Sequence, residues 1–211
     1  MSYTLYGSPG TASMCVHWML IELGVSFEFV SLDFSKNATK DPAYLKINPG
    51  GHVPALVIDG QAYAETAALL MILAERHPER GFAPAIGAPD RALYLQWMII
   101  LANTLMPAFR LFYYADEGAG PENADATKAQ AVLRINKVFD RVDGLLADGR
   151  PYLLGDKLRA ADFLLAMLAR WSRNLPRTAL DWPYVKAYVE RVRALPSYRE
   201  THNREGLQGW I

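Results

Sequence analysis

The chain has 211 residues, of which half are hydrophobic and about a fifth are charged. This is the profile of a globular protein with one large domain or two small ones. Basic and acidic side chains balance at 22 each, so charge favours neither nucleic acid nor an anionic membrane as a partner. We find no apolar run of membrane-spanning length and no secretion signal, and we expect a cytoplasmic protein. A single cysteine, Cys15, excludes an intramolecular disulfide and a multi-cysteine metal site.

The first eighty residues alternate between strand-like and helix-like segments. The clearest signal is the pair Asp59-Gly60 between two apolar runs, which is typical of a tight hairpin turn. Gly24 and Pro78 mark the ends of two amphipathic segments that we predict to be helices. The order β-α-β-α-β-β-α follows, with elements predicted at residues 3–7, 12–24, 26–33, 42–48, 54–58, 61–64 and 65–77.

The character of the sequence changes after residue 80, because no convincing strand follows. Residues 81–90 are rich in glycine and proline and are predicted to be a linker. Residues 91–211 are predicted to form an all-helical domain, whose first long helix is interrupted near Pro107. We therefore expect an α/β domain over residues 1–80 followed by an all-α domain.

One motif carries a family resemblance. The stretch "INPGGHVPALVIDG", followed directly by "QAYAETAALL", resembles the cytosolic glutathione transferases, and the resemblance extends over essentially the whole chain. It implies a thioredoxin-like glutathione-binding domain and a helical domain that carries the electrophile pocket. It also implies a homodimeric transferase that uses glutathione as co-substrate, without a metal, and joins its thiolate to small apolar electrophiles.

The resemblance assigns the glutathione-binding residues one by one. Val53 and Pro54 match the family's Val–cis-Pro pair, whose backbone would hold the cysteinyl residue of glutathione as an added strand. Glu65 and Thr66 match the acidic residue and hydroxyl at the next helix start, where the γ-glutamyl ammonium and carboxylate would bind. The alternative is that Glu65 and Thr66 are only a good helix start. His52 is a candidate for the glycine end, or a plain loop histidine.

The stretch "SPGTAS" is predicted to place a hydrogen-bond donor at the thiol. It resembles the bacterial beta-class form Ser-Pro-Gly-Ala-Cys-Ser, but the cysteine of that form falls on Ala12. Classes that use serine place it near what is here Gly10. Ser13 is the first candidate for the donor, Thr11 the second and Ser8 the third. The alternative is that Ser13 is only the cap of the first helix.

A later window, "RAAD", resembles the family's helix-capping box, with Asp162 present and Arg159 in place of the hydroxyl residue. We expect a cap weakened by about 1 kcal/mol.

The family builds its electrophile pocket from the first helix of the second domain and the C-terminal tail. Packing in the helical core is the alternative for about half of the aromatic side chains concerned. The matching residues are Met106, Phe109, Phe112, Tyr113, Tyr114, Trp171 and Trp210.

Two other functions remain open. Because Gly10 and Ala12 occupy the usual activating positions, one alternative is a non-catalytic binding or scaffold protein with the same fold. The other is a glutathione-dependent isomerase, peroxidase or dehalogenase.

Overall fold

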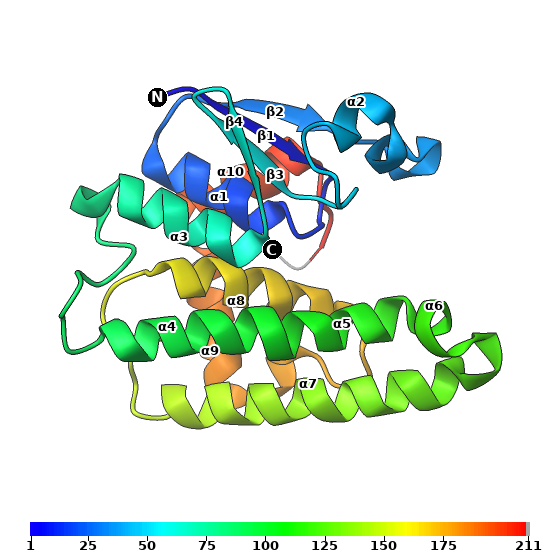
Figure 1. The fold of residues 1–211 in the computed structure, drawn as a ribbon. Coiled ribbons are helices and arrows are strands. Elements are labelled where there is room, and N and C mark those ends of the chain that lie inside the picture. The colour runs from blue at the N-terminus through cyan, green and yellow to red at the C-terminus, as the bar shows by residue number, and fades with distance from the viewer. Residues whose placement is uncertain (210–211) are drawn as a thin grey trace. The chain divides into compact units, whose positions relative to one another are not determined.

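The computed structural model describes residues 1–209, apart from the side chains of residues 118 and 119 (Figure 1). Trp210, one of the predicted pocket residues, lies outside the described residues. Contacts divide the chain into two units: Met1–Ala83 together with the segment from Arg193 onward, and Pro84–Val192. The C-terminal segment, which the sequence grouped with the helical domain, thus belongs to the first unit by its contacts.

The first unit is built on a four-stranded sheet in the order β2-β1-β3-β4. Strand β1 runs parallel to β2 and antiparallel to β3, and β3 and β4 form an antiparallel hairpin. Asp59 and Gly60 both have positive φ (49° and 86°), as the predicted hairpin turn requires. The strands are β1 (Tyr3–Gly7), β2 (Glu28–Ser31), β3 (Ala55–Ile58) and β4 (Gln61–Ala64).

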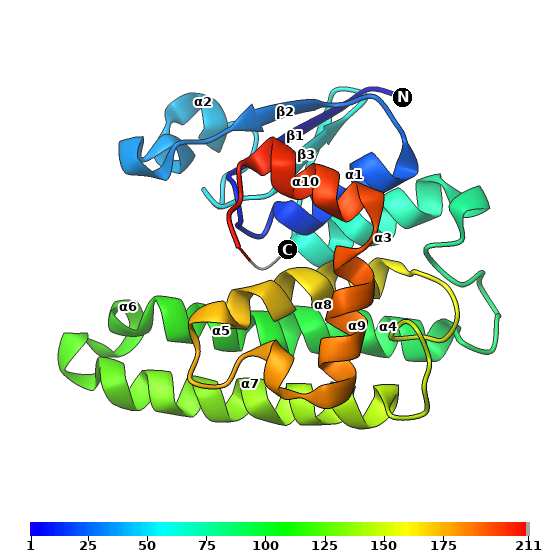
Figure 2. The same cartoon turned by 180° about the vertical axis from the view of Figure 1, so that it is seen from behind.

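Helices complete this unit in the predicted order. Helix α1 packs against α3 and also against α10, and Figure 2 shows α10 beside α1. Gly24 ends α1 in the left-handed conformation (φ 72°), as its position predicted. The helices are α1 (Met14–Leu23), α2 (Pro42–Leu45), α3 (Thr66–Arg76) and α10 (Pro196–Glu205), with 3-10 turns at Phe34–Lys36, Ala38–Lys40 and Pro78–Arg80.

Among the described residues of the second unit, the regular elements are all helices, and an isolated β-bridge joins Tyr152 and Gly155 in the loop before α8. Its centre is α8, in which every residue from Ala160 to Arg170 is buried. Helix α5 packs along α7, and α4 and α5 both contact α8. The helices are α4 (Arg91–Ile100), α5 (Met106–Tyr113), α6 (Ala115–Ala119), α7 (Ala124–Leu146), α8 (Ala160–Trp171) and α9 (Pro183–Arg193), with 3-10 turns at Pro121–Asn123, Ser172–Asn174 and Ala179–Asp181.

The predicted interruption near Pro107 takes the form of a π-helical turn at Leu101–Leu105, directly before α5. Proline has no N–H group and its ring collides with the carbonyl four residues earlier in a regular helix. A wider turn at this point accommodates that ring while the chain continues as a helix.

The same stretch corrects the expectation that no segment reaches spanning length. Among the residues described, Arg91–Tyr113 is long and apolar enough to cross a bilayer by length and composition alone. A core helix passes the same test. Tyr94, Trp97 and Leu101 are buried, and 39% of the apolar segment is buried in the structure.

The start of α8 retains half of the predicted capping box. The Asp162 carboxylate accepts the backbone N–H of Arg159 at 2.8 Å and that of Leu153 at 2.9 Å. The Arg159 guanidinium has no acceptor to offer the helix and instead lies 3.3 Å from the Asp90 carboxylate. Burial raises the pKa of Asp162 to about 7. The expected weakening of the cap stays a prediction.

Candidate functional site

Strand register brings three loops to one corner of the sheet. Tyr6 on β1 lies opposite Ala55 on β3, and Ala55 lies opposite Ala64 on β4. Ser8, Val53 and Glu65 are each within two residues of these partners along the chain. Because adjacent strands are about 4.8 Å apart, the predicted thiol, cysteinyl and γ-glutamyl positions meet at the same sheet corner.

The Val53–Pro54 peptide bond is cis, as the resemblance implied. Two hydrogen bonds fix the loop that precedes this peptide bond. The His52 carbonyl accepts from the Tyr44 hydroxyl at 2.5 Å and from the Asn48 side-chain amide at 2.7 Å. Within the described part of the chain, the backbone N–H and C=O of Val53 make no hydrogen bond. They are therefore open to an added extended peptide.

Glu65 lies directly before α3 in an uncommon conformation, with φ 71° and ψ 107°. Positive φ at a non-glycine residue costs about 1–3 kcal/mol and is concentrated at functional sites. Its side chain is exposed, and among residues 1–209 it has no hydrogen-bond or ion-pair partner. Thr66 is the first residue of α3, so its N–H group points out of the helix start. The pair offers a carboxylate beside free N–H groups.

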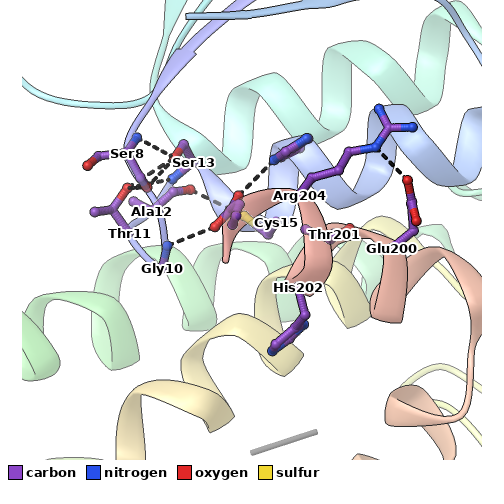
Figure 3. A network of polar contacts seen from close by, with 12 residues as sticks. Ser8, Gly10, Thr11, Ala12, Ser13, Cys15, Glu200, Thr201, His202 and Arg204 are labelled. Carbon is purple, nitrogen blue, oxygen red and sulfur yellow. Dashed lines mark hydrogen bonds and ion pairs between the residues drawn. The ribbon is translucent and has the colours of Figure 1, made fainter. Parts of the chain in front are cut away.

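The hydroxyl of Ser13 is turned inward. Ser13 is fully buried at the start of α1, and its Oγ accepts the Ser8 N–H at 3.1 Å and donates to the Ser8 carbonyl at 3.1 Å (Figure 3). The close approach depends on Gly7, because a Cβ there would lie 2.4 Å from Ser13 Oγ. The hydroxyl of Ser13 is thus part of the turn between β1 and α1.

Thr11 is half-buried in the same turn. Its hydroxyl donates to the Ser8 carbonyl at 2.7 Å and lies 3.0 Å from Ser13 Oγ. The neighbouring N–H of Ala12 makes no hydrogen bond to any residue that the structure describes. Which side chain meets a glutathione sulfur stays a prediction. The candidate donors in this turn are the Thr11 hydroxyl, the Ala12 amide and the hydroxyl of the half-buried Ser8, which makes no hydrogen bond to the described residues.

Other residues singled out in the sequence lie as follows. Cys15 is buried on α1, and burial raises the pKa of its thiol, as expected for a small apolar core residue. The side chain of His52 is exposed. In the part of the chain that is described, no three His, Cys, Asp or Glu side chains gather where they could hold a metal ion.

The predicted pocket residues of the helical unit differ in exposure. Phe109 is fully buried and packs edge-on against Phe139 and Trp171, as the core alternative expects. Tyr113 and Tyr114 are partly exposed (37% and 44%). The Tyr113 hydroxyl donates to the Trp171 carbonyl, and the Tyr114 ring lies 4.3 Å from the Arg110 guanidinium. Met106 and Trp171 are half-buried.

Sequence reasoning missed four residues that shape this site. Tyr44 and Asn48 hold the loop before Pro54. Glu205 and His17 form a buried pair that reaches Gly10, with His17 Nδ1 2.8 Å from Glu205 Oε1. Asn48, beside a Pro-Gly-Gly turn, had a local signal; Glu205 had none, because its partners lie at the other end of the chain.

A sheet with a cis-proline loop that is open to a peptide, beside a helix start, is the architecture of a thioredoxin-like domain. Family models for the glutathione S-transferase N-terminal and C-terminal domains match residues 1–75 and 101–196. The chain belongs to the glutathione S-transferase family.

Proteins that are similar to this chain in sequence and in structure carry the same family name. Glutathione S-transferase 3 of Zea mays is 30% identical, with 93% of this chain and 91% of the relative covered. A glutathione transferase structure from Methylococcus capsulatus is 32% identical with TM-score 0.85, covering 97% of this chain and 98% of the other. A Sulfitobacter homologue with bound glutathione is 27% identical with TM-score 0.89, covering 98% and 99%.

Proposed function

We propose that this protein is a glutathione S-transferase that joins the glutathione thiolate to small apolar electrophiles. The observation that carries the proposal is the sheet corner. There the open backbone of Val53 adjoins the free carboxylate of Glu65 and the start of α3. Relatives of the same family include structures with glutathione bound.

Each end of the tripeptide has a complementary group. The cysteinyl residue pairs with the backbone of Val53 as an added strand. The γ-glutamyl ammonium pairs with Glu65, and the γ-glutamyl carboxylate meets the N–H groups and hydroxyl at Thr66. His52 faces the glycine end, and Ser8 lies at the thiol end.

The thiol is activated by hydrogen bonds rather than by a general base. A free thiol has a pKa of about 8.5. A hydrogen bond to an anion contributes about 1.5–3 kcal/mol and a helix N-terminus about 0.3–1 kcal/mol. At about 1.36 kcal/mol per pKa unit, these lower the thiol pKa by about one to three units, to about 5.5–7.5, so that thiolate is a substantial fraction of the bound glutathione at neutral pH.

Thr11 is the side-chain donor that the geometry favours, ahead of Ser13, which the sequence ranked first. Turning the Thr11 hydroxyl toward a sulfur leaves the Ser8 carbonyl with two other donors, Ser13 Oγ at 3.1 Å and the Thr11 N–H at 3.2 Å. The rotation leaves no carbonyl without a hydrogen-bond donor, so its free-energy cost is small. Ser13 would have to leave a fully buried position.

Glutathione titration calorimetry tests the binding site. Glu65→Ala should weaken affinity by about 2 kcal/mol, roughly 25-fold, since it leaves the bound ammonium unpaired. Glu190→Ala is the matched control, because Glu190 is exposed on α9 and forms no ion pair among the described residues. Equal affinity for the Glu65 and Glu190 variants would overturn the assignment.

A non-catalytic glutathione-binding protein is the second candidate. It is favoured by the inward-facing Ser13 and by the Gly10 amide, which is occupied by Glu205. The ultraviolet absorbance of bound thiolate, followed against pH, separates the two. A thiol pKa that stays at its free value in the wild type, with no turnover of chloro-dinitrobenzene, an epoxide, a hydroperoxide or a maleyl compound, would favour binding alone. Turnover of the hydroperoxide or the maleyl compound alone would favour the peroxidase or the isomerase alternative.

The remaining parts of the proposal concern the second substrate and the assembly. Met106, Tyr113, Tyr114 and Trp171 line the electrophile pocket, and one of the two tyrosines donates its hydroxyl to a leaving group or epoxide oxygen. Phe109 supports that pocket from the core. The protein acts as a cytoplasmic homodimer without a metal.

A further inference from the structure

The end of α10 is tied to the turn that precedes α1. Glu205, the last residue of α10, is buried, and its Oε2 accepts the backbone N–H of Gly10 at 2.7 Å. Its Oε1 lies 2.8 Å from Nδ1 of His17, on α1. Figure 3 labels Ser8, Gly10 and Thr11 in this turn and marks the hydrogen bond of Gly10 with a dashed line.

The Glu205 carboxylate lies against the His17 ring, which is itself held between apolar side chains. The ring is buried, stacks on Phe29 at 4.5 Å and meets the edge of Phe27 at 5.4 Å. Within residues 1–209, His17 Nε2 has no hydrogen-bond partner. The imidazole therefore has one polar contact, Glu205, and a buried carboxylate needs such a partner to offset its desolvation.

Contacts with α1 also hold the rest of α10, and they fix the position of the Glu205 carboxylate. The indole N–H of Trp18 donates to the Ser197 hydroxyl at 2.8 Å, and the Trp18 ring packs edge-on against Tyr198. The first and last turns of α10 are thus both fixed to α1. Glu205 is held by its helix and by His17, and it imposes a position on Gly10 rather than following it.

Gly10 has φ 69°, a left-handed conformation that glycine adopts without strain, and it leads directly into the next two residues of the turn. Those residues, Thr11 and Ala12, carry two of the candidate donors at the proposed thiol position. The turn is held from one side by Ser13 and from the other by Glu205. The Gly10 amide is taken by Glu205, so the sulfur must use the donors that follow it.

We propose that Glu205, paired with His17, is a positioning residue that holds the Gly10 amide and so aims the Thr11 hydroxyl and Ala12 amide at the glutathione sulfur. This rests on the proposed function. The Glu205 carboxylate forms a hydrogen bond within this turn, and a negative charge near the sulfur disfavours a thiolate. The other groups on this side are the Arg204 guanidinium, which pairs with Glu200, and the buried thiol of Cys15.

The test compares Glu205→Ala and Glu205→Gln in the full-length protein, with Glu200→Ala as the matched control. Glutamine keeps an oxygen acceptor for Gly10, whereas alanine removes it. Glu200 is on the same helix and pairs with Arg204 at the surface. Two readouts are measured: hydrogen exchange of residues 7–13 without ligand, and the thiolate absorbance of bound glutathione against pH.

We expect Glu205→Ala to speed exchange of residues 7–13 by about tenfold or more and to raise the pKa of the bound glutathione thiol by about one unit, a tenfold decrease in its ionisation constant. Glutathione affinity should change less than threefold or so, because Val53 and Glu65 hold the rest of the peptide. Glu205→Gln should restore both readouts toward the wild type, and Glu200→Ala should change neither. Glu205→Asp retains the charge but, with its shorter side chain, moves the accepting oxygen away from Gly10. If the alanine variant does not fold, we expect the aspartate variant to show the same changes in exchange and in thiol pKa.

A stable Glu205→Ala or Glu205→Asp variant with unchanged exchange and unchanged thiol titration would overturn the inference. A Glu205→Gln variant that raises the pKa of the bound thiol as far as Glu205→Ala does would also overturn it, because the oxygen that accepts the Gly10 N–H would then be irrelevant. A wild-type protein that fails to bind glutathione would overturn the proposed function instead, and the two failures are thereby distinguished.

Discussion

Replacing Ser13 by alanine separates two roles for its hydroxyl, building the turn and donating to the glutathione sulfur. The hydroxyl accepts the Ser8 N–H and donates to the Ser8 carbonyl, both at 3.1 Å, in a fully buried position. Alanine leaves the Ser8 N–H without its acceptor. An unmade hydrogen bond at a buried donor costs about 1–3 kcal/mol.

The lower part of that range applies, because Ser8 itself is half-buried and water can satisfy part of the demand. The Ser8 carbonyl also keeps the Thr11 hydroxyl at 2.7 Å. We therefore expect Ser13→Ala to lower the free energy of unfolding by about 1–2 kcal/mol. Urea unfolding at constant pH measures this, and Ser26→Ala is the control, since Ser26 is exposed and its hydroxyl has no hydrogen bond to the described residues.

The second measurement is the titration of bound glutathione in Ser13→Ala and Thr11→Ala. The turn-building role predicts that Thr11→Ala raises the thiol pKa more than Ser13→Ala does. A Ser13→Ala protein that is as stable as Ser26→Ala, but whose bound thiol pKa rises by about one unit or more, would refute this reasoning and return the donor role to Ser13.

Two further predictions concern the helical unit and the assembly. Asp162→Ala should lower the free energy of unfolding near pH 5 by about 2–4 kcal/mol, because the N–H groups of Leu153 and Arg159 lose their acceptor. In the wild type, burial raises the pKa of Asp162 to about 7 from about 3.9 in the unfolded chain, so the native state holds a proton that the unfolded state has released. The stability from this group is therefore complete below about pH 4 and is lost as the pH rises to about 7; urea unfolding across this window should show the slope in the wild type and not in Asp162→Ala. For the assembly, sedimentation at micromolar concentration should give twice the chain mass of 23.6 kDa, and a single species at the chain mass would contradict the dimer.

Local signals in the sequence were sufficient to predict most of the secondary structure of the first unit. The Asp59-Gly60 turn, the stop at Gly24 and the order of strands and helices follow from residue types and spacing, and all are found in the structure. The cis bond at Val53–Pro54 came from the family motif and is also found. The bounds of several elements differ by a few residues; α3, for example, was predicted at residues 65–77 and covers Thr66–Arg76, with Glu65 preceding it as the cap.

The surroundings of the thiol position could not be predicted in the same way. The inward turn of Ser13 depends on Gly7, whose missing side chain leaves room for its hydroxyl. The contact of Gly10 with Glu205 joins residues 195 positions apart. Periodicity and capping rules describe neighbours along the chain, so they rank hydroxyls by their place in a helix start and not by the direction in which packing points them.

Under the proposed function, this arrangement would explain how the turn activates a thiol although Gly10 and Ala12 stand where other classes carry the activating side chain. The Ser13 hydroxyl closes the turn from inside, and Glu205 holds the Gly10 amide from α10. With both fixed, the Thr11 hydroxyl and the Ala12 amide are left at the start of α1, where the helix dipole adds to their effect. A rigid pair of donors loses little entropy on meeting an anion. A modest donor set, held in place by contacts from the far end of the chain, can therefore supply what a dedicated nucleophile-activating side chain supplies elsewhere in the family.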